Sequence, residues 1–461
     1  MLSQLFKTFA NCLKIPELRS RILFTGLVLV VARLVSMTPV PGLDGGALSA
    51  FLAEQAKNTS GGNSVLALYS LFTGGAIERC AVGALGIMPY ISATIIIQLL
   101  SAVVPALNKL LREEGGRAKI IAYGRYLTVL LCLGQGFFMS LGWENPQATF
   151  NGFPGKLVMI ENVWVYRIQT TIILTTATLL LMWLGEQITE RGVGNGVSLI
   201  IMIGILARLP NAVQALWKTF WPSADMPRTG NWMYVIFLLL LLVAVVGAVV
   251  MITQGQRKIP VQYAQRAIGR KVYSGGTSYI PLKVNYTGVM PVIFAQAILM
   301  LPGMLLQKAG QLWNVPFFLT LSTYFSYSSW IYFFIEGALI LFFAYFWVAT
   351  QFNELQIADD LKKHGGYIPG VRPGQATADT LHRTMNRITF AGGIFLVVIA
   401  LIPTLMTRLL QLDYSITQFF GGTSMLITVG VVLDTMRQME SFLLMRNYDG
   451  FLKKGRVRGR T

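Results

Sequence analysis

Residues 70–100 read SLFTGGAIERCAVGALGIMPYISATIIIQLL, and the stretch changes character near its middle. Up to about Cys80 it is too short and too polar to cross a bilayer, because Glu78 and Arg79 follow the glycine pair Gly74–Gly75. From about Gly86 it is strongly apolar and is typical of a membrane-spanning helix, which needs about 20 apolar residues. The stretch predicts a re-entrant half-helix, hinged on glycine, that precedes a span. An ordinary glycine-rich loop before a helix is the alternative.

Apolar runs of this length recur along the whole chain. The chain has 461 residues, of which 54% are hydrophobic and only 13% are charged. A soluble domain carries about 25% charged residues. This composition excludes an ordinary soluble enzyme, a disordered protein and a coiled coil, and it favours one membrane-embedded body. We predict ten spans, at about residues 22–40, 80–104, 120–142, 164–184, 195–217, 232–252, 286–306, 330–350, 388–408 and 421–440.

The positions of the basic residues predict the orientation of the chain. The net charge is +18, and most of the lysines and arginines fall on one side of the predicted spans. By the positive-inside rule, that side and both termini are cytoplasmic. Residues 1–21 are predicted to form an amphipathic helix in the membrane interface, and residues 441–461 a basic cytoplasmic tail. The predicted cytoplasmic loops 253–285 and 351–387 are longer than is needed to connect two spans. They are predicted to bind a cytosolic partner.

The spans divide into an N-terminal half, 22–218, and a C-terminal half, 219–440. Each half holds five spans, so two structurally similar halves must be inverted relative to each other. Glycine and proline interrupt the second span of each half, which points to a central pathway between repeats. Broken backbone at membrane depth is tolerated only beside protein or a water-filled cavity. The interrupting residues are Gly74, Gly75, Gly83, Gly86 and Pro89 in the first half and Gly288, Pro291, Pro302 and Gly303 in the second.

Catalytic and metal-binding patterns are scarce. The three cysteines, Cys12, Cys80 and Cys132, are widely spaced, and the two histidines, His364 and His382, share one polar loop. These residues make a zinc site improbable. Ser198 has no histidine close in sequence, and Glu186 and Glu190 are predicted to be solvated. A membrane enzyme therefore ranks last, and no cofactor is expected.

The polar residues inside the spans distinguish the hypothesis of a channel from that of an ion-coupled carrier. The interior polar residues are mostly amides, and we expect no aspartate or glutamate at mid-span. Buried membrane charge is the usual mark of ion-coupled transport, so its scarcity argues against such a carrier. A small-molecule transporter stays as the second hypothesis, because broken spans and inverted repeats suit it. With no nucleotide-binding loop in the sequence, a channel needs a partner to supply energy.

Five stretches resemble the SecY family, the pore-forming subunits of the bacterial protein-translocation channel. They occur in the family's order, and the resemblance runs from about Leu18 to Gly450. The stretches are GALGIMPYISATIIIQLL at 83–100, WLGEQITERGVGNGVS at 183–198, YIPLKVNYTGVMPVIF at 279–294, GYIPGVRPG at 366–374 and GGTSMLI at 421–427.

The resemblance implies an all-α polytopic membrane protein with ten transmembrane helices, in two inverted five-helix halves around an hourglass pore. A re-entrant plug at about 70–82 closes the pore, and a lateral gate opens between the second and third spans and the seventh and eighth. Carried over residue by residue, the pore ring comprises Ile87, Ile91, Val197, Ile293 and Ile427. The plug comprises Thr73, Gly74, Gly75, Ala76, Ile77, Glu78, Arg79 and Cys80, and the gate lining comprises Gln98, Gln135 and Gln296.

The resemblance also implies partners and a location. The expected partners are the small membrane subunits SecE and SecG, the SecA motor ATPase, the ribosome, signal-bearing preproteins and membrane lipid, including anionic lipid. The expected location is the bacterial inner membrane. Three positions depart from the family pattern, namely Val197, Glu354 and Asp360. Docking of the motor or the ribosome is expected at Arg257, Lys258, Arg266, Arg270, Lys271 and Arg372.

Overall fold

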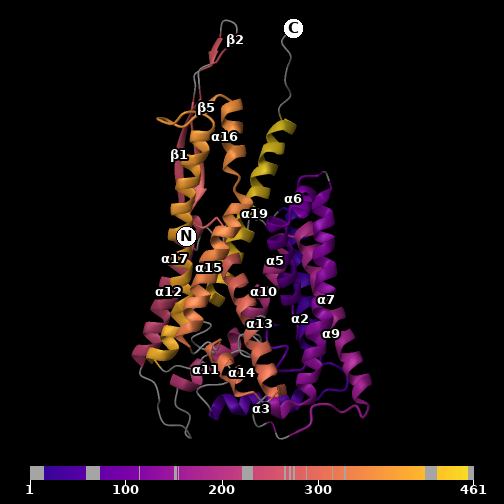
Figure 1. Ribbon diagram of the computed structural model, residues 1–461. Helices are drawn as coiled ribbons and strands as arrows, with labels where there is room; N and C mark the ends of the chain where they lie inside the picture. Colours follow the sequence, from indigo (N-terminus) through magenta and orange to yellow (C-terminus); the bar gives the residue numbers. More distant parts are fainter. Residues whose placement is uncertain are drawn as a thin grey trace. The chain divides into compact units, whose positions relative to one another are not determined.

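The structure is a computed structural model, shown in Figure 1, and divides into two compact units. Unit 1 comprises Met1–Trp217 with Val431–Thr461, and unit 2 comprises Lys218–Gly430. The described residues are 15–58, 73–113, 115–149, 153, 155–220, 232–263, 266–268, 271–273, 276–286, 288–313, 315–325, 329–410 and 423–454. Most of the predicted N-terminal helix at 1–21 and the first residues of the predicted plug lie outside them.

Each of the ten predicted spans lies at least partly on helix, although residues 80–87 are not helical and span 195–217 is divided between two helices. The helices of unit 1, spans and shorter helices together, are α2 (Pro16–Met37), α3 (Gly45–Asn58), α5 (Met88–Val103), α6 (Pro105–Arg112), α7 (Gly116–Glu144), α8 (Pro146–Thr149), α9 (Val163–Arg191) and α10 (Gly196–Leu206). They are followed by α11 (Leu209–Phe220), which crosses into unit 2. In unit 2 they are α12 (Trp232–Gln254), α13 (Met290–Trp313), α14 (Pro316–Tyr324), α15 (Trp330–Gln351), α16 (Glu354–Lys363) and α17 (Gln375–Leu410). The last helix, α19 (Thr423–Lys454), begins in unit 2 and continues in unit 1. Among the described residues, seven helices are long and apolar enough to cross a membrane.

N-capping side chains and first-turn prolines mark the beginnings of several helices. The side chain of Asn162 accepts hydrogen bonds from the first turn of α9, and Asn195 does the same for α10. Ser329 caps α15 in the same way. Proline occupies the first turn of α2 and α5, where its missing N–H removes no helical hydrogen bond. Local sequence therefore sets these starting points.

In unit 1, α7 and α9 pack side by side and are joined by two ion pairs (Figure 1). Arg125 of α7 binds both carboxylate oxygens of Glu186 in α9, at 3.1 and 2.8 Å. Arg167 of α9 binds both oxygens of Glu144 in α7, at 2.9 and 3.0 Å. Such bidentate pairs are geometrically specific. Glu186 was expected only to be solvated, whereas it is partly buried and paired with Arg125, 61 residues away in sequence. Glu190 is exposed, as expected.

A close helix approach explains one glycine of the turn between α9 and α10. A Cβ atom at Gly196 would collide with the backbone carbonyl of Gly185. No other residue lacks that atom. The hydroxyl of Thr189 also accepts a hydrogen bond from the Gly196 amide at 2.9 Å. This turn holds the first residues of α10 against α9.

In unit 2, α15 packs against α13 and α17. Pro302 lies inside α13, which continues to Trp313. The expected interruption at Pro302 and Gly303 is therefore wrong, because a membrane helix tolerates the one hydrogen bond that proline removes.

Unit 2 contains strands that the sequence did not predict. They are β1 (Gln256–Tyr263), β2 (Arg266–Ile268), β3 (Lys271–Tyr273), β4 (Thr277–Lys283) and β5 (Gly366–Tyr367). Strand β1 pairs antiparallel with both β4 and β5, and β2 pairs with β3. The fold is thus helical in its spans and adds this small sheet outside them. The predicted loop 351–387 is also largely ordered structure, because it holds α16, β5 and the start of α17.

Candidate functional site

The five predicted ring residues lie at the beginnings of four different helices. Ile87 caps α5, and Ile91 follows one turn later, its amide donating to the Ile87 carbonyl at 3.2 Å. Val197 is the second residue of α10, and Ile293 lies in the first turn of α13. Ile427 is the fifth residue of α19. All are buried except Val197, which is partly buried. Each unit therefore presents apolar side chains at helix N-termini.

The predicted plug is not helical over most of its described length. Residues 74–80 form consecutive turns, and helix resumes only at Met88. The physical reason is backbone geometry, because Gly74, Gly75 and Cys80 have positive φ angles of 64°, 84° and 46°. An α-helix requires negative φ throughout. The prediction of a half-helix is wrong for these residues, although Thr73, Ala76 and Ile77 are buried in unit 1.

Gln296 has a partner that the sequence analysis missed. Its side-chain amide in α13 donates to a carboxylate oxygen of Glu336 in α15 at 3.2 Å. Glu336 is only 1% exposed and Gln296 4%. The expectation of no mid-span carboxylate is therefore wrong. Glu336 was visible in the sequence as the seventh residue of α15.

The remaining atoms of this pair are buried without partners. Among the described residues, neither the second oxygen of Glu336 nor the amide oxygen of Gln296 has a hydrogen-bond partner. Unsatisfied buried polar atoms are costly. The pair therefore joins α13 and α15 through one polar contact rather than a fully satisfied network.

The other two predicted gate glutamines lie on neighbouring helices of unit 1. Gln98 is in α5 and Gln135 is in α7, and these two helices pack together. Both side chains are partly buried. The amide oxygen of Gln98 is buried and has no hydrogen-bond partner in the described part of the chain.

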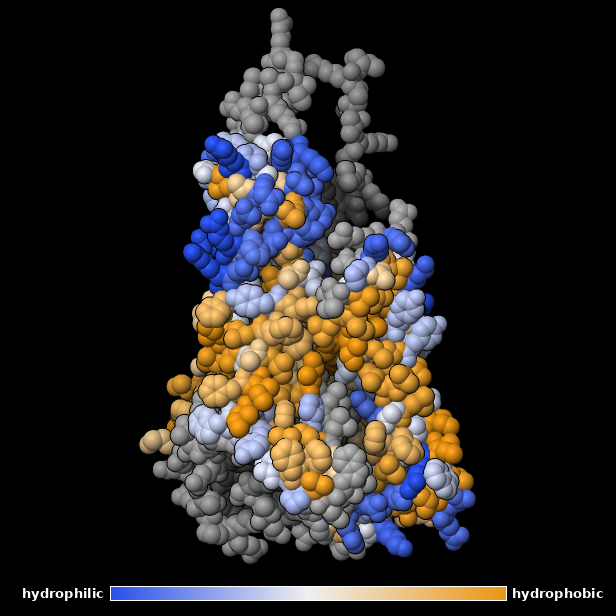
Figure 2. All heavy atoms as spheres, in the orientation of Figure 1, coloured by the Kyte–Doolittle hydropathy of each residue, from blue (hydrophilic) through white to orange (hydrophobic). Residues whose placement is uncertain are grey.

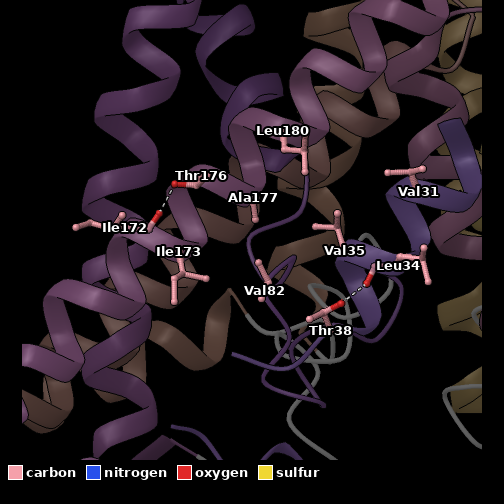
Figure 3. A pocket seen from close by; sticks show the side chains of 10 residues that line it. All are labelled: Val31, Leu34, Val35, Thr38, Val82, Ile172, Ile173, Thr176, Ala177 and Leu180. Carbon is pink, nitrogen blue, oxygen red and sulfur yellow. Dashed lines mark hydrogen bonds between the residues drawn. The ribbon is translucent and has the colours of Figure 1, made fainter. Parts of the chain in front are cut away.

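Unit 1 also has an apolar pocket of about 430 Å³ between α2 and α9 (Figure 3). The hydroxyls of Thr38 and Thr176 are satisfied within their own chain segments, because they donate to the carbonyls of Leu34 and Ile172. A polar ligand would therefore find few free partners, and the pocket suits an apolar occupant. The lining residues are Val31, Leu34, Val35, Thr38, Val82, Ile172, Ile173, Thr176, Ala177 and Leu180.

The two predicted docking loops meet in one sheet. Gln262 and Tyr263 of β1 pair with Tyr367 and Gly366 of β5, so loop 253–285 and loop 351–387 form a single body, called here the sheet body. Its core includes Val261, Leu282, Ile368 and Leu381. In Figure 2, hydrophilic side chains gather over the region of β1, β5 and α16, while the helices of the same unit below them are hydrophobic.

The predicted docking residues are distributed over this body. Arg257 and Lys258 are exposed on β1. Arg266 belongs to β2 and Lys271 to β3, at the far end of the hairpin from the spans (Figure 1). Arg270 lies outside the described residues.

Arg372 is displayed by a hydrogen-bonded turn. The Val371 amide donates to the Ile368 carbonyl, and the Thr377 hydroxyl donates to the Arg372 carbonyl, both at 3.0 Å. Ile368 is buried, whereas Arg372 is exposed. The turn therefore holds the backbone of Arg372 in place and leaves its guanidinium accessible.

Glu354, a departure from the family pattern, joins α16 to α17. Its carboxylate contacts His382 Nδ1 at 2.7 Å, and Asn386 contacts His382 Nε2 at 3.0 Å. The histidines do not share a loop, because His382 lies within α17. This contact fixes α17, the helix that follows the Arg372 turn, to α16.

We predict that Val261→Asp opens the sheet formed by β4, β1 and β5. Val261 is buried in β1, and an unpaired carboxylate there costs several kcal/mol. Hydrogen exchange of the β1 and β4 amides should accelerate by about 100-fold or more. The matched control is Gln262→Asp on the exposed face of the same strand. Equal exchange rates in both variants would contradict this account of the sheet.

The sequence carried only a weak signal for this sheet. QRKIPVQY at 256–263 and TSYIPLK at 277–283 contain β-branched and aromatic residues, which favour strands. In β1, buried Ile259 and Val261 alternate with exposed neighbours. A search for period-two alternation would have found the hairpin, but not its pairing with β5.

Comparison with known proteins identifies the family. A sequence model of the SecY family matches residues 81–436. Protein translocase subunit SecY of Thermotoga maritima is 40% identical over 459 residues, covering 99% of this chain and 100% of the relative. The same subunit of Vibrio cholerae is 41% identical over 456 residues, covering 96% of each chain.

Solved structures share the fold. One described as a protein-conducting channel has a TM-score of 0.62 and 21% identity, covering 91% of each chain. Sec61 from a canine ribosome–channel complex has a TM-score of 0.59 and 20% identity, again covering 91% of each chain. The buried aliphatic residues at helix starts, the glycine-containing segment before α5 and the near full-length sequence matches lead to one conclusion: this chain belongs to the SecY family of protein translocase subunits.

Proposed function

We propose that this chain is a protein-conducting channel, which passes unfolded secretory polypeptides across the membrane and releases apolar segments into lipid. The observation that carries the proposal is the match to translocase subunits at about 40% identity over nearly the whole length of both chains. A translocase subunit of this family is a channel and not an enzyme. Family membership also decides against a small-molecule transporter, an alternative that Glu336 would otherwise favour.

The pore is proposed to narrow at Ile87, Ile91, Val197, Ile293 and Ile427, between two inverted five-helix halves. A ring of aliphatic side chains resists ions by excluding water, yet makes no specific contact with a passing chain. Burial of four of these side chains supports the assignment. The segment Thr73–Cys80 is proposed as the plug that blocks this pathway in the resting channel.

A lateral gate is proposed between α5 and α7 on one side and α13 and α15 on the other. Leu, Ile, Phe and Val favour the membrane centre by about 0.3–0.6 kcal/mol each. An apolar segment that meets an open gate therefore partitions into lipid without another source of energy. The polar contact between Gln296 and Glu336 supports this role for α13 and α15, because one hydrogen bond can hold an interface that must also move.

We propose that cytosolic partners supply the energy for translocation and that further partners bind the chain in the bilayer. The SecA motor or the ribosome docks on the β1–β4 hairpin and the Arg372 turn, a proposal that the exposed Arg257, Lys258 and Arg372 support. One of the small membrane subunits, SecE or SecG, fills the apolar pocket between α2 and α9. The chain lies in the bacterial inner membrane with both termini in the cytoplasm and contacts anionic lipid there.

Site-specific crosslinking tests the proposal. A photoreactive residue is placed at Ile91, and separately at Ile293, in membranes that hold a stalled, signal-bearing secretory chain. We expect both positions to crosslink to the chain in transit and to lose the crosslink when the signal is deleted. The control position is Val398, which is exposed on α17.

Two outcomes would contradict the proposal in different ways. Crosslinks from Val398 but from neither ring position, in folded protein, would overturn the ring assignment. Substrate-dependent uptake of a small molecule by the purified protein, without a motor, would restore the transporter alternative.

A further inference from the structure

The segment that precedes α5 is held to unit 1 in two different ways. At its C-terminal end, residues 80–83 are bonded through the backbone to the end of α2 and the residues after it. The Val82 amide donates to the Thr38 carbonyl at 2.8 Å, and the Val40 amide donates to the Cys80 carbonyl at 2.9 Å. These bonds make residues 80–83 a fixed end.

The backbone carbonyls of Ala76 and Ile77, which precede Cys80, are bonded differently. The carbonyls of Ala76 and Ile77 accept from Ala81 and Cys80, so these bonds stay inside the segment. Gly74 packs closely against α10, because a Cβ built on it would lie 3.1 Å from the Gly204 Cα. Packing against α10 therefore helps to hold this part of the segment.

Of the two charged side chains in the segment, Glu78 and Arg79, that of Glu78 has a partner at the junction of α10 and α11. The Glu78 carboxylate forms an ion pair with Arg208, a residue 130 positions away in sequence. Arg208 also lies beside Gly75, since a Cβ built there would be 3.8 Å from its Nη2. One guanidinium thus pairs with Glu78 and also lies near Gly75.

The pair is accessible enough to break and re-form. The Glu78 side chain is 37% exposed and the Arg208 side chain 21%. Partly exposed ion pairs contribute little to stability, because water can reach the carboxylate when the partners separate. The contact is therefore suited to reversible release rather than to permanent structure.

We propose that the Glu78–Arg208 ion pair is the releasable tie that keeps the plug segment against the α10–α11 junction in the resting channel. Residues 80–83 serve as the fixed end about which the segment moves. Glu78 and Arg208 are positioning residues for the plug. This inference rests on the proposed channel function and assigns a specific contact to its closed state.

The test compares variants in proteoliposomes that contain the full channel complex and no preprotein. Glu78→Gln keeps the shape of the side chain and removes its charge, and ion leak should rise by about fivefold. The reversed pair, Glu78→Arg with Arg208→Glu, should return the leak toward the wild-type value. Glu186→Gln is the matched control, because it breaks an ion pair between α7 and α9 away from the segment.

A second readout reports the position of the segment itself. Ala76 is fully buried, so an Ala76→Cys probe should react slowly with an impermeant maleimide. Adding Glu78→Gln should raise that rate by about the same factor as the leak. A general loss of folding would instead raise labelling in the Glu186→Gln background as well.

The same vesicles separate failure of the tie from failure of the function. Translocation of a signal-bearing chain by wild-type protein, with leak and labelling unchanged in Glu78→Gln, overturns the tie and leaves the channel intact. No translocation by the folded wild-type complex overturns the proposed function. A leak that the reversed pair does not reduce also counts against the tie.

Discussion

Replacing Ile427 with asparagine is expected to raise ion leak through the resting channel by about tenfold or more. Ile427 is fully buried near the start of α19. A buried amide without partners costs roughly 1–3 kcal/mol, and 1.4 kcal/mol is a factor of ten in an equilibrium. The substitution therefore disfavours the dry, closed state relative to a wetted one. Conductance of the purified complex in planar bilayers measures the change.

The same variant should relax the requirement for a good signal sequence. A closed state that opens more easily needs less binding energy from the signal, so export of a chain with a defective signal should increase. Val398→Asn is the matched control, since Val398 is exposed on α17 and its change should leave the leak unaffected. Unchanged leak and unchanged signal stringency in folded Ile427→Asn protein would remove Ile427 from the ring.

Replacing Arg372 with alanine is expected to lower motor-driven translocation by about tenfold to 100-fold. The turn from Ile368 to Gly374 holds the Arg372 backbone and exposes its guanidinium. A hydrogen bond to a charged group contributes about 1.5–3 kcal/mol, which corresponds to that range. Initial rates of translocation, measured against motor concentration, test the prediction.

The control for this prediction is Arg383→Ala. Arg383 is an exposed cation of the same sheet body, on α17 rather than in the turn. If both variants lose activity equally, net charge rather than the Arg372 turn governs motor docking. Hydrogen exchange over β1 and β5 should be unchanged in Arg372→Ala, because the side chain is outside the core.

Most of the helical fold could be predicted from the sequence. Long apolar runs must form helices in a bilayer, because backbone groups there have no water to bond. Each run therefore predicted its own helix, such as α12 and α15. Pro302 shows the limit of local rules, since the rule that proline breaks helices failed inside α13.

The polar details were less predictable because they depend on distant partners. Glu336 can be read directly from the sequence, but the mean hydropathy of an apolar span conceals a single carboxylate. Its partner, Gln296, lies 40 residues away in sequence. The pairing of β1 with β5 joins segments about a hundred residues apart. Composition and periodicity describe one segment at a time, so they cannot predict such pairs.

The sequence by itself determined that this protein is a helical membrane protein of the SecY family. Its apolar runs set the spans, and its motifs match translocase subunits over nearly the full chain. Only the tertiary structure decided that residues 74–80 form turns, that Glu78 pairs with Arg208 and that the two predicted docking loops share a sheet. The physical reason is that membrane burial acts on each segment separately, whereas ion pairs and strand pairing depend on which segments the fold brings together.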